Sequence, residues 1–254
     1  MLGAISRHIQ AFLLALQFLT ILPTPKNLAH DAPLQGLALL WYPAVGLLVG
    51  LLLMMVCSVL PLPFYLQAAL TVTVWIVLTG GLHLDGLADC ADAWVGGLGD
   101  RERTLHLLKD PLCGSMGVIA LVVAVLLKTL ALAAVIEAQQ LHWLWVVPLV
   151  ARLSLLLLFL TMNYVRPQGL GAVLAQHFSR AGARSVLVGS AVLLLFVLPL
   201  DIWLAFSLLL VGLCLIIRWA AMRRIGGFTG DIAGAQIELV EVGLLLALAS
   251  RTVV

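Results

Sequence analysis

Charged residues are scarce in this sequence. Asp, Glu, Lys and Arg together make up 10% of its 254 residues, whereas they make up about a quarter of an ordinary soluble domain. Hydrophobic residues make up 63% of the chain, and the mean hydropathy is +1.15. This composition excludes an ordinary soluble domain. It predicts an all-α, polytopic integral membrane protein in which residues 1–254 form a single membrane-embedded domain.

Cysteine is also sparse, and the positive and negative charges are nearly equal in number. The four cysteines form no C-x-x-C pair, which excludes a disulfide framework and a zinc site of the usual spacing. The formal net charge is only +2, which says little about partners. We expect no nucleic-acid partner. The sequence shows no internal repeat. The cysteines are Cys57, Cys90, Cys113 and Cys214.

Long apolar runs are abundant, and they predict about seven transmembrane helices. Residues 4–22 carry several polar side chains and end at Pro23, so they predict an additional N-terminal helix that is interfacial or re-entrant. After Asp100, a short amphipathic helix is expected over residues 101–109. The expected spans cover residues 36–60, 65–79, 114–136, 143–162, 185–198, 202–221 and 232–249.

The basic residues predict the orientation of these spans. With seven spans in alternation, the loops that carry Lys and Arg all fall on one side of the membrane, which the positive-inside rule assigns to the cytoplasm. The opposite loops, around residues 61–64, 138–142 and 199–201, contain no Lys or Arg.

Three aspartates stand out in a chain with only twelve acidic residues. Asp85, Asp89 and Asp92 are spaced i, i+4 and i+7, which places them on one stripe of a helix. Three like charges so close together favour a bound cation, and Mg²⁺ prefers oxygen ligands. We therefore predict that these three residues are catalytic and bind Mg²⁺. The alternative is a solvated acidic face at the membrane boundary.

A second polar segment, residues 223–241, lies on the same predicted side. Its glycine-rich turn leads into a helix, and both features favour anion binding. Asp231, at the end of the turn, is a candidate catalytic residue. Glu238 is another, because ionisable groups within a span are costly and usually functional. The alternatives are an ordinary turn and a structural pairing of the glutamates with an arginine. Candidate substrate contacts in this segment are Arg223, Arg224, Gly227, Thr229 and Glu241.

Other polar residues near these segments are weaker candidates. Arg152 lies in the middle of a span, where it can contact substrate or pair with a glutamate. His83, Lys109 and Ser115 are candidate substrate contacts, although a structural histidine and a capping serine are the simpler interpretations of His83 and Ser115. For Lys128 the sequence favours snorkelling, or pairing with Glu137 or Glu241.

The sequence TGGLHLDGLAD at residues 79–89, continued by GSMG at residues 114–117, resembles the first signature of the cobalamin synthase family, the adenosylcobinamide-GDP ribazoletransferases. The second is GGFTGDIAGA at residues 226–235, followed by Glu238 and Glu241. The similarity extends to residues 18–25 and 169–171, and so covers nearly the whole chain.

This resemblance implies the final step of nucleotide-loop assembly in cobalamin biosynthesis. The enzyme would join α-ribazole, or α-ribazole 5′-phosphate, to adenosylcobinamide-GDP and release GMP. It would require Mg²⁺ and lie in the bacterial cell inner membrane, with its active site facing the cytoplasm. The sequence does not determine the oligomeric state, and a homo-oligomer is compatible with it.

Two other functions fit parts of the sequence. Asp85-Gly86 begins like the signature of CDP-alcohol phosphotransferases, but Asp89 stands where that signature has arginine. An ion-coupled transporter could be built around Arg152, Glu238 and Glu241, and it would predict repeats with matching broken helices. No such repeat is visible.

Overall fold

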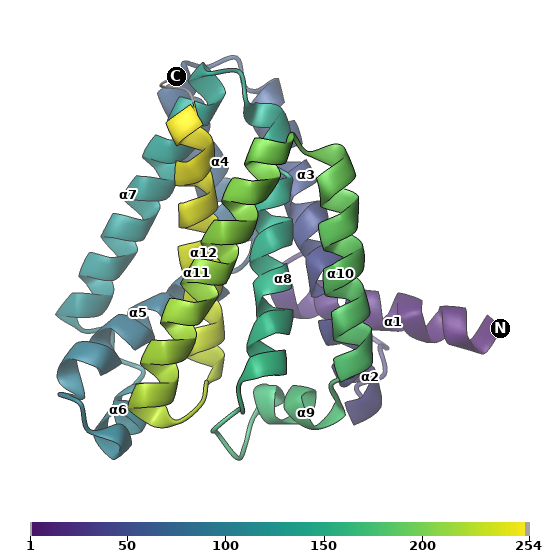
Figure 1. The fold of residues 1–254 in the computed structure, drawn as a ribbon, viewed down its shortest axis with the longest axis vertical. Coiled ribbons are helices and arrows are strands. Elements are labelled where there is room, and N and C mark those ends of the chain that lie inside the picture. Colours follow the sequence, from purple (N-terminus) through teal and green to yellow (C-terminus); the bar gives the residue numbers. More distant parts are fainter. Residues whose placement is uncertain (1, 252–254) are drawn as a thin grey trace.

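The protein is built from helices. The computed structural model describes residues 2–251, and within that range the only pairing of the strand type is an isolated bridge between Tyr164 and Phe228 (Figure 1). The all-α fold predicted from the sequence is therefore confirmed. The α-helices are α1 (Leu2–Leu19), α2 (Ala32–Leu39), α3 (Tyr42–Val59), α4 (Phe64–Leu78), α5 (Leu82–Gly96), α6 (Arg101–Leu107), α7 (Ser115–Glu137), α8 (Val146–Thr161), α9 (Leu170–His177), α10 (Arg180–Val197), α11 (Leu200–Ile225) and α12 (Gly230–Ser250).

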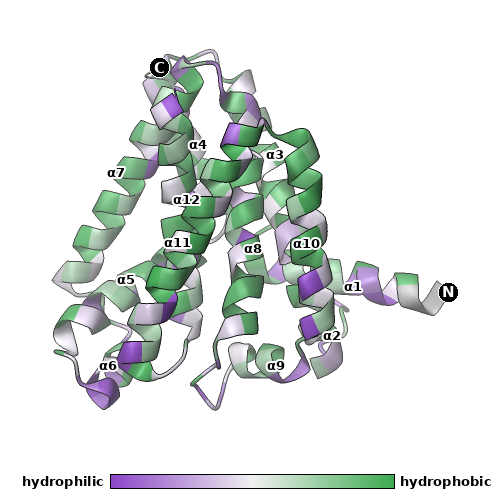
Figure 2. Ribbon diagram, in the orientation of Figure 1, coloured by the Kyte–Doolittle hydropathy of each residue, from purple (hydrophilic) through white to green (hydrophobic). Residues whose placement is uncertain are grey.

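Six helical segments among the described residues are long and apolar enough to cross a membrane, and a bent pair raises the number to seven. The six contain α3, α7, α8, α10, α11 and α12, and the bent pair is α4 with α5. Apolar residues dominate these helices, and polar residues gather at one end of the bundle, around α6 and the adjoining helix ends (Figure 2). α1 extends sideways from the bundle (Figure 1), as expected for a helix at the membrane interface.

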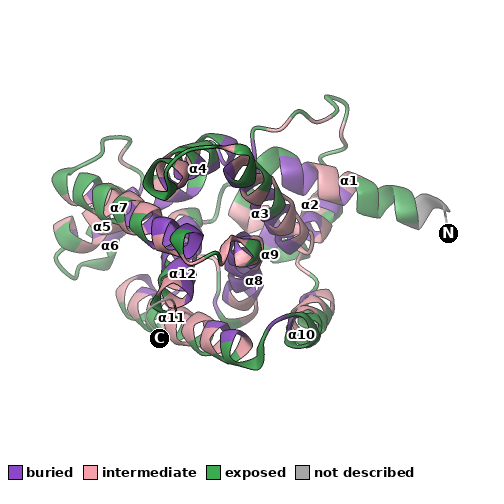
Figure 3. Ribbon diagram, turned by 90° about the horizontal axis from the view of Figure 1, so that it is seen from above, coloured by how far each residue is buried: buried purple, intermediate pink, exposed green. Residues whose placement is uncertain are grey.

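Helices α8 and α12 lie at the centre of the bundle (Figure 3). In the most apolar 18 residues of each segment, 72% of the residues are buried in the segment that contains α8 and 67% in α12. The corresponding share is 11% in α10 and in α11. A helix that is apolar all round is buried among other helices or faces lipid. The two central helices therefore carry the residues that other helices contact, while α10 and α11 present most of their apolar surface outward.

A sharp bend separates α4 from α5 and directs the aspartate helix across the end of the bundle. The two helices differ in direction by 89°, and the turn between them contains Gly80 at φ +62° and Gly81 at φ +68°, values that strongly favour glycine. α5 therefore does not continue the direction in which α4 runs through the bundle. Gly86 then brings α5 against α12, because a Cβ at Gly86 would lie 2.7 Å from the carbonyl oxygen of Asp231.

Some predicted boundaries were wrong. The span expected over residues 36–60 is broken at Leu40 and Trp41, so that Pro43 lies in the first turn of α3 and not in the interior of a helix. The predicted polar loop over residues 163–184 contains α9, and α10 begins within it at Arg180. Proline is well tolerated in the first turn of a helix, because the N–H groups there have no partner within the helix.

Arginines fasten the polar end of the bundle. The side chain of Arg101 donates to the carbonyl oxygen of Ile225 at 3.0 Å, and Arg224 donates to the carbonyl oxygen of Trp94 at 3.1 Å. These contacts join α6 and α5 to the end of α11. At the start of α11, Asp201 pairs with Arg251, which follows α12.

Candidate functional site

A cavity of about 320 Å³ lies between α5, α8, α12 and the loop that follows α8. We call it the site cavity. Its polar end is formed by His83, Asp85, Arg166 and Asp231. Much of its remaining wall is aromatic, from Phe18, Tyr42, Phe159, Tyr164 and Phe228. A concave, largely apolar cavity with a few convergent ionisable groups is the usual form of a small-molecule site.

The loop after α8 reaches this cavity because it pairs with the glycine-rich turn before α12. The N–H of Val165 donates to the carbonyl oxygen of Phe228 at 3.0 Å, and the N–H of Phe228 donates to that of Asn163 at 3.0 Å. A Cβ at Gly227 would lie 2.3 Å from the Asn163 carbonyl oxygen. Glycine is therefore required at position 227 for this close approach.

The pairing places Arg166 beside Asp231. Its Nη2 donates to Asp231 Oδ2 at 2.7 Å and to the carbonyl oxygen of Leu108 at 2.7 Å. The hydroxyl of Thr229 also donates to Asp231 Oδ2, at 3.0 Å, and Thr229 is the N-cap residue of α12. Asp231 is thus held by two side chains at the start of α12, where the helix dipole favours an anion.

Asp85 and Asp89 lie one turn apart on α5, and Asp231 adds a third acidic group close to them. Partial burial, together with the charges of Asp85 and Asp231, raises the pKa of Asp89 to about 6. Excess negative charge of this kind suits a divalent cation, and Mg²⁺ is commonly held by one or two carboxylates completed by substrate phosphates. Within residues 2–251, no three His, Cys, Asp or Glu side chains are arranged to hold a metal ion by themselves.

Asp92 has a different environment from the other two aspartates of the stripe. Its Oδ2 accepts from the N–H of Gly114 at 2.7 Å, and its Oδ1 accepts from the N–H of Gly117 at 2.9 Å. Asp92 therefore caps the N-terminus of α7 from a neighbouring helix. The expectation that Ser115 caps this helix was wrong. Ser115 is the first residue of α7, and the N-cap position is occupied by Gly114, which forms no side-chain capping bond.

His83 lies on α5, two residues before Asp85, and lines the same cavity. It is 3% exposed, and neither ring nitrogen has a hydrogen-bond partner among the described residues. Burial, and then the charges of Arg152 and Lys128, hold its pKa well below the usual value, so the imidazole is neutral. Because His83 lines the site cavity, its free ring nitrogens are available to a bound ligand.

Beneath His83, four charged side chains form a buried cluster, which we call the ion cluster. Lys128 Nζ binds Glu238 Oε2 at 2.7 Å and also binds Glu241, which in turn binds Arg152. Lys128 Nζ lies 4.4 Å from the centroid of the Trp75 ring. The cluster joins α7, α8 and α12, and the pairings of Glu241 with Lys128 and Arg152 that the sequence suggested are confirmed.

The remaining predicted contacts lie outside the site cavity. Lys109 and Ser115 are exposed, and Arg223 is exposed on α11 with its guanidinium over the Trp219 ring. Arg224 donates to Trp94 and to Thr104. The structure thus gives Arg224 a packing role, and it does not bring Lys109, Ser115 or Arg223 to the polar end of the cavity.

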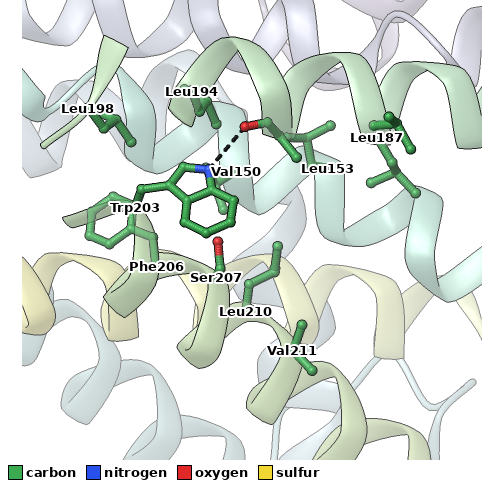
Figure 4. Close-up of a pocket in the computed structure, with 12 residues that line it drawn as sticks. Val150, Leu153, Leu187, Leu194, Leu198, Trp203, Phe206, Ser207, Leu210 and Val211 are labelled. Carbon is green, nitrogen blue, oxygen red and sulfur yellow. Dashed lines mark hydrogen bonds between the residues drawn. The ribbon is translucent and has the colours of Figure 1, made fainter. Parts of the chain in front are cut away.

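A different cavity, of about 310 Å³, lies between α8, α10 and α11 (Figure 4). Its walls are leucine, valine and aromatic side chains, and its polar groups are Ser207 and the Trp203 indole, which donates to the carbonyl oxygen of Ala191 at 3.0 Å. No ionisable side chain is among the described residues that line it. This cavity can hold an acyl chain or another apolar group, but not a diphosphate.

The comparisons with known proteins agree with the motifs that form the site. A family model described as "Cobalamin-5-phosphate synthase" matches residues 11–249. The chain belongs to the cobalamin-5-phosphate synthase family. One relative, from Pseudomonas fluorescens, is 49% identical over 239 residues, which cover 94% of this chain and 98% of the relative. No solved structure matches the chain.

Other members of this family are similar over the same extent. A relative from Pseudomonas syringae is 46% identical over 241 residues, which cover 94% of this chain and 98% of the relative. One from Stutzerimonas stutzeri is 48% identical over 242 residues, covering 93% and 96%. All three relatives carry the name adenosylcobinamide-GDP ribazoletransferase.

Sequence reasoning missed two residues that complete the site of this cobalamin-5-phosphate synthase family member. In the sequence, Arg166 is one of the loop residues behind the predicted orientation and nothing more, and Lys128 is expected only to snorkel or to pair with a glutamate. The nearby motif Gly169-Leu170-Gly171 was a signal for the first, because it marks the loop that carries Arg166 as part of the family pattern. For the second, the signal was the presence of two glutamates and two cations in spans otherwise nearly free of charge.

Proposed function

We propose that the chain is an adenosylcobinamide-GDP ribazoletransferase that joins α-ribazole, or its 5′-phosphate, to adenosylcobinamide-GDP. The observation that carries the proposal is the 46–49% identity, over nearly the whole chain, to relatives with that name. The acidic end of the site cavity supports it, because transfer from a diphosphate depends mainly on positioning and on neutralisation of charge.

In this reaction a hydroxyl oxygen of the ribose forms a bond to the phosphorus that carries the cobinamide arm. The bond from that phosphorus to the oxygen bridging it to GMP breaks, and GMP leaves with both electrons of the bond. The hydroxyl loses its proton. In α-ribazole 5′-phosphate the 5′ oxygen is already esterified, so the attacking hydroxyl shared by both acceptors is one on the ribose ring.

The residues at the polar end have complementary roles in the proposal. Arg166 binds a phosphate oxygen of the donor while it remains paired with Asp231. Asp231, held by Arg166 and Thr229, accepts the proton of the attacking hydroxyl. His83 contacts the substrate through a neutral ring nitrogen. Glu238 and Glu241 support the floor of the cavity through the ion cluster.

We further propose that Asp85 and Asp89 bind Mg²⁺ together with the substrate diphosphate. Bound Mg²⁺ would offset the charge of the diphosphate and of the departing GMP. The raised pKa of Asp89 supports this assignment, since that carboxylate lacks a cation of its own. Asp92 is left out of the proposed metal site because both of its oxygens accept hydrogen bonds from backbone N–H groups.

The proposed location is the bacterial inner membrane, with the site cavity open toward the cytoplasm. The support is the arrangement of basic residues, because Arg101, Arg166 and Arg224 bind groups at the end of the bundle that carries the polar end of the cavity. Positively charged loops favour the cytoplasmic side.

The test is turnover by the purified protein in lipid, with adenosylcobinamide-GDP and α-ribazole, in the presence and absence of Mg²⁺. We expect GMP and cobalamin to appear in equal amounts and only with Mg²⁺. A folded protein that releases neither product, or that releases CMP from a CDP-alcohol donor but no GMP from adenosylcobinamide-GDP, would contradict the proposed function.

A further inference from the structure

A second cavity, of about 220 Å³, adjoins the site cavity between α1, α2 and α9. The two cavities share four lining residues, Phe18, Tyr42, Leu170 and Leu174. They are therefore two chambers of one cleft, which runs from the acidic end of the bundle to the junction of α1 and α2. The wall between them carries a stacked aromatic pair, Phe18 and Tyr42, whose ring centroids are 5.9 Å apart with an interplanar angle of 26°.

The second cavity has an apolar lining with a few unused polar atoms. Gln35 donates through Nε2 to the carbonyl oxygen of His30 at 2.9 Å, but its buried Oε1 has no partner among the described residues. The Tyr42 side chain is 3% exposed, and within residues 2–251 its hydroxyl forms no hydrogen bond. Buried polar atoms usually have partners, so a ligand that donates to Gln35 Oε1 suits this chamber, and the Tyr42 hydroxyl is free to bind the same ligand.

We propose that the second cavity and its Phe18–Tyr42 wall bind the aromatic base of the acceptor nucleoside. This inference rests on the proposed function, in which the acceptor is a riboside of dimethylbenzimidazole. The base packs against the aromatic pair, and Tyr42 donates to its unsubstituted ring nitrogen. Gln35 Oε1 accepts from a ribose hydroxyl, and the reacting hydroxyl faces Asp231 in the site cavity.

Size and polarity select this base over the other ring systems in the reaction. A corrin macrocycle with its amide arms is far larger than a chamber of about 220 Å³. Guanine presents several hydrogen-bond donors and acceptors, and no Asp or Glu is among the described residues that line the second cavity. A dimethylated benzimidazole has two apolar methyl groups and one free ring acceptor, which matches a lining rich in leucine and aromatic carbon.

The test compares Phe18→Ala and Tyr42→Phe with a control, Phe196→Ala, which makes the same truncation at a side chain that is 82% exposed on α10. For Phe18→Ala we expect KM for α-ribazole to rise about 5- to 100-fold, as for the loss of base stacking on an aromatic ring. For Tyr42→Phe we expect a rise of about fivefold, from one neutral hydrogen bond. KM for adenosylcobinamide-GDP should stay within about twofold in both variants, and the control should match the wild type.

Direct titration of α-ribazole into the lipid-embedded protein separates this inference from the proposed function. The wild type should bind α-ribazole, and Phe18→Ala should weaken that binding by the same factor as it raises KM. An active enzyme whose variants change KM for the donor and not for α-ribazole would overturn the inference while leaving the function in place. A wild type that binds α-ribazole at this wall but releases no GMP would overturn the proposed function alone.

A third variant keeps the inference testable if Tyr42→Phe or Phe18→Ala fails to fold. Leu170 lines both chambers and is 40% exposed, so Leu170→Gln should fold. It should reduce the preference for dimethylbenzimidazole riboside over the corresponding adenine riboside by at least about fivefold. An unchanged preference would contradict the assignment of this chamber to the base.

Discussion

The ion cluster makes a quantitative prediction about stability. Lys128 is 2% exposed and holds Glu238 and Glu241 while its ammonium faces the ring of Trp75. Together with Arg152 the cluster contains two positive and two negative charges, so it is neutral as a whole. Lys128→Met keeps most of the side-chain volume but leaves one negative charge in excess within the bundle.

Breaking a buried ion pair by removal of one partner typically costs about 3–5 kcal/mol, because the remaining charge stays buried without compensation. We expect Lys128→Met to lower the free energy of unfolding by that amount. The double variant Lys128→Met/Glu238→Gln restores neutrality and leaves the Arg152–Glu241 pair in place. It should therefore recover at least half of the lost stability, although it carries one more substitution.

The assay is equilibrium unfolding in mixed micelles of a mild detergent and SDS, with helix content as the signal. Lys109→Met is the matched control, because Lys109 is exposed and has no ion-pair partner within residues 2–251, and surface substitutions usually change stability by less than about 0.5 kcal/mol. A Lys128→Met variant as stable as this control, or a double variant less stable than the single one, would contradict the predicted cost of the unpaired charge.

The proposed site makes further predictions. The pKa of Asp89 is raised to about 6 by burial and by Asp85 and Asp231. We expect the affinity for divalent cations to fall as the pH is lowered through about 6, because the protonated acid cannot bind the cation. Titrations with Mn²⁺ in place of Mg²⁺ from pH 5 to 8 measure this affinity, and an affinity that does not change with pH contradicts the prediction. Asp92→Ala should lower the free energy of unfolding by about 1–2 kcal/mol through loss of a helix cap while Mg²⁺ dependence is retained, which thermal melts and turnover at several Mg²⁺ concentrations check. Arg166→Gln should raise KM for adenosylcobinamide-GDP at least about tenfold, through loss of a charge-assisted bond to phosphate, and an unchanged KM argues against that contact.

Local sequence patterns predicted the helices well. The i, i+4, i+7 spacing of the aspartates predicted a helix that the structure has as α5, and Asp100 caps α6 as expected, accepting from the N–H of Arg103 at 2.7 Å. Such features depend on residues within one or two turns of each other. A single sequence contains all the information needed to predict them.

Contacts between distant segments were harder to predict. Arg166 and Asp231 are separated by 65 residues, and Lys128 and Glu238 by 110. The first pairing depends on the bridge between the loop after α8 and the turn before α12, and the second depends on the packing of α7 against α12. Hydropathy and spacing identified the charged residues in the spans, but tertiary packing decides which of them meet.

The same distinction applies to the aspartate stripe. The spacing placed three carboxylates on one side of α5, but it could not show that Asp92 faces the start of α7. At the start of α7, a Cβ at Gly117 would lie 2.4 Å from a carboxylate oxygen of Asp92. The glycines of the GSMG motif therefore make room for a capping carboxylate, and a phosphate-binding role is not needed to explain them.

The most direct test of the central claim is turnover by the wild type and by Asp85→Asn side by side in lipid, with GMP and cobalamin measured together. Asp85 lines the site cavity and carries a proposed Mg²⁺ contact. We expect equal release of both products by the wild type and a decrease of at least about 100-fold in Asp85→Asn, with an unchanged melting temperature. Asp201→Asn, at the opposite end of the bundle, is the control. Full turnover by a folded Asp85→Asn variant at millimolar Mg²⁺ would contradict the account.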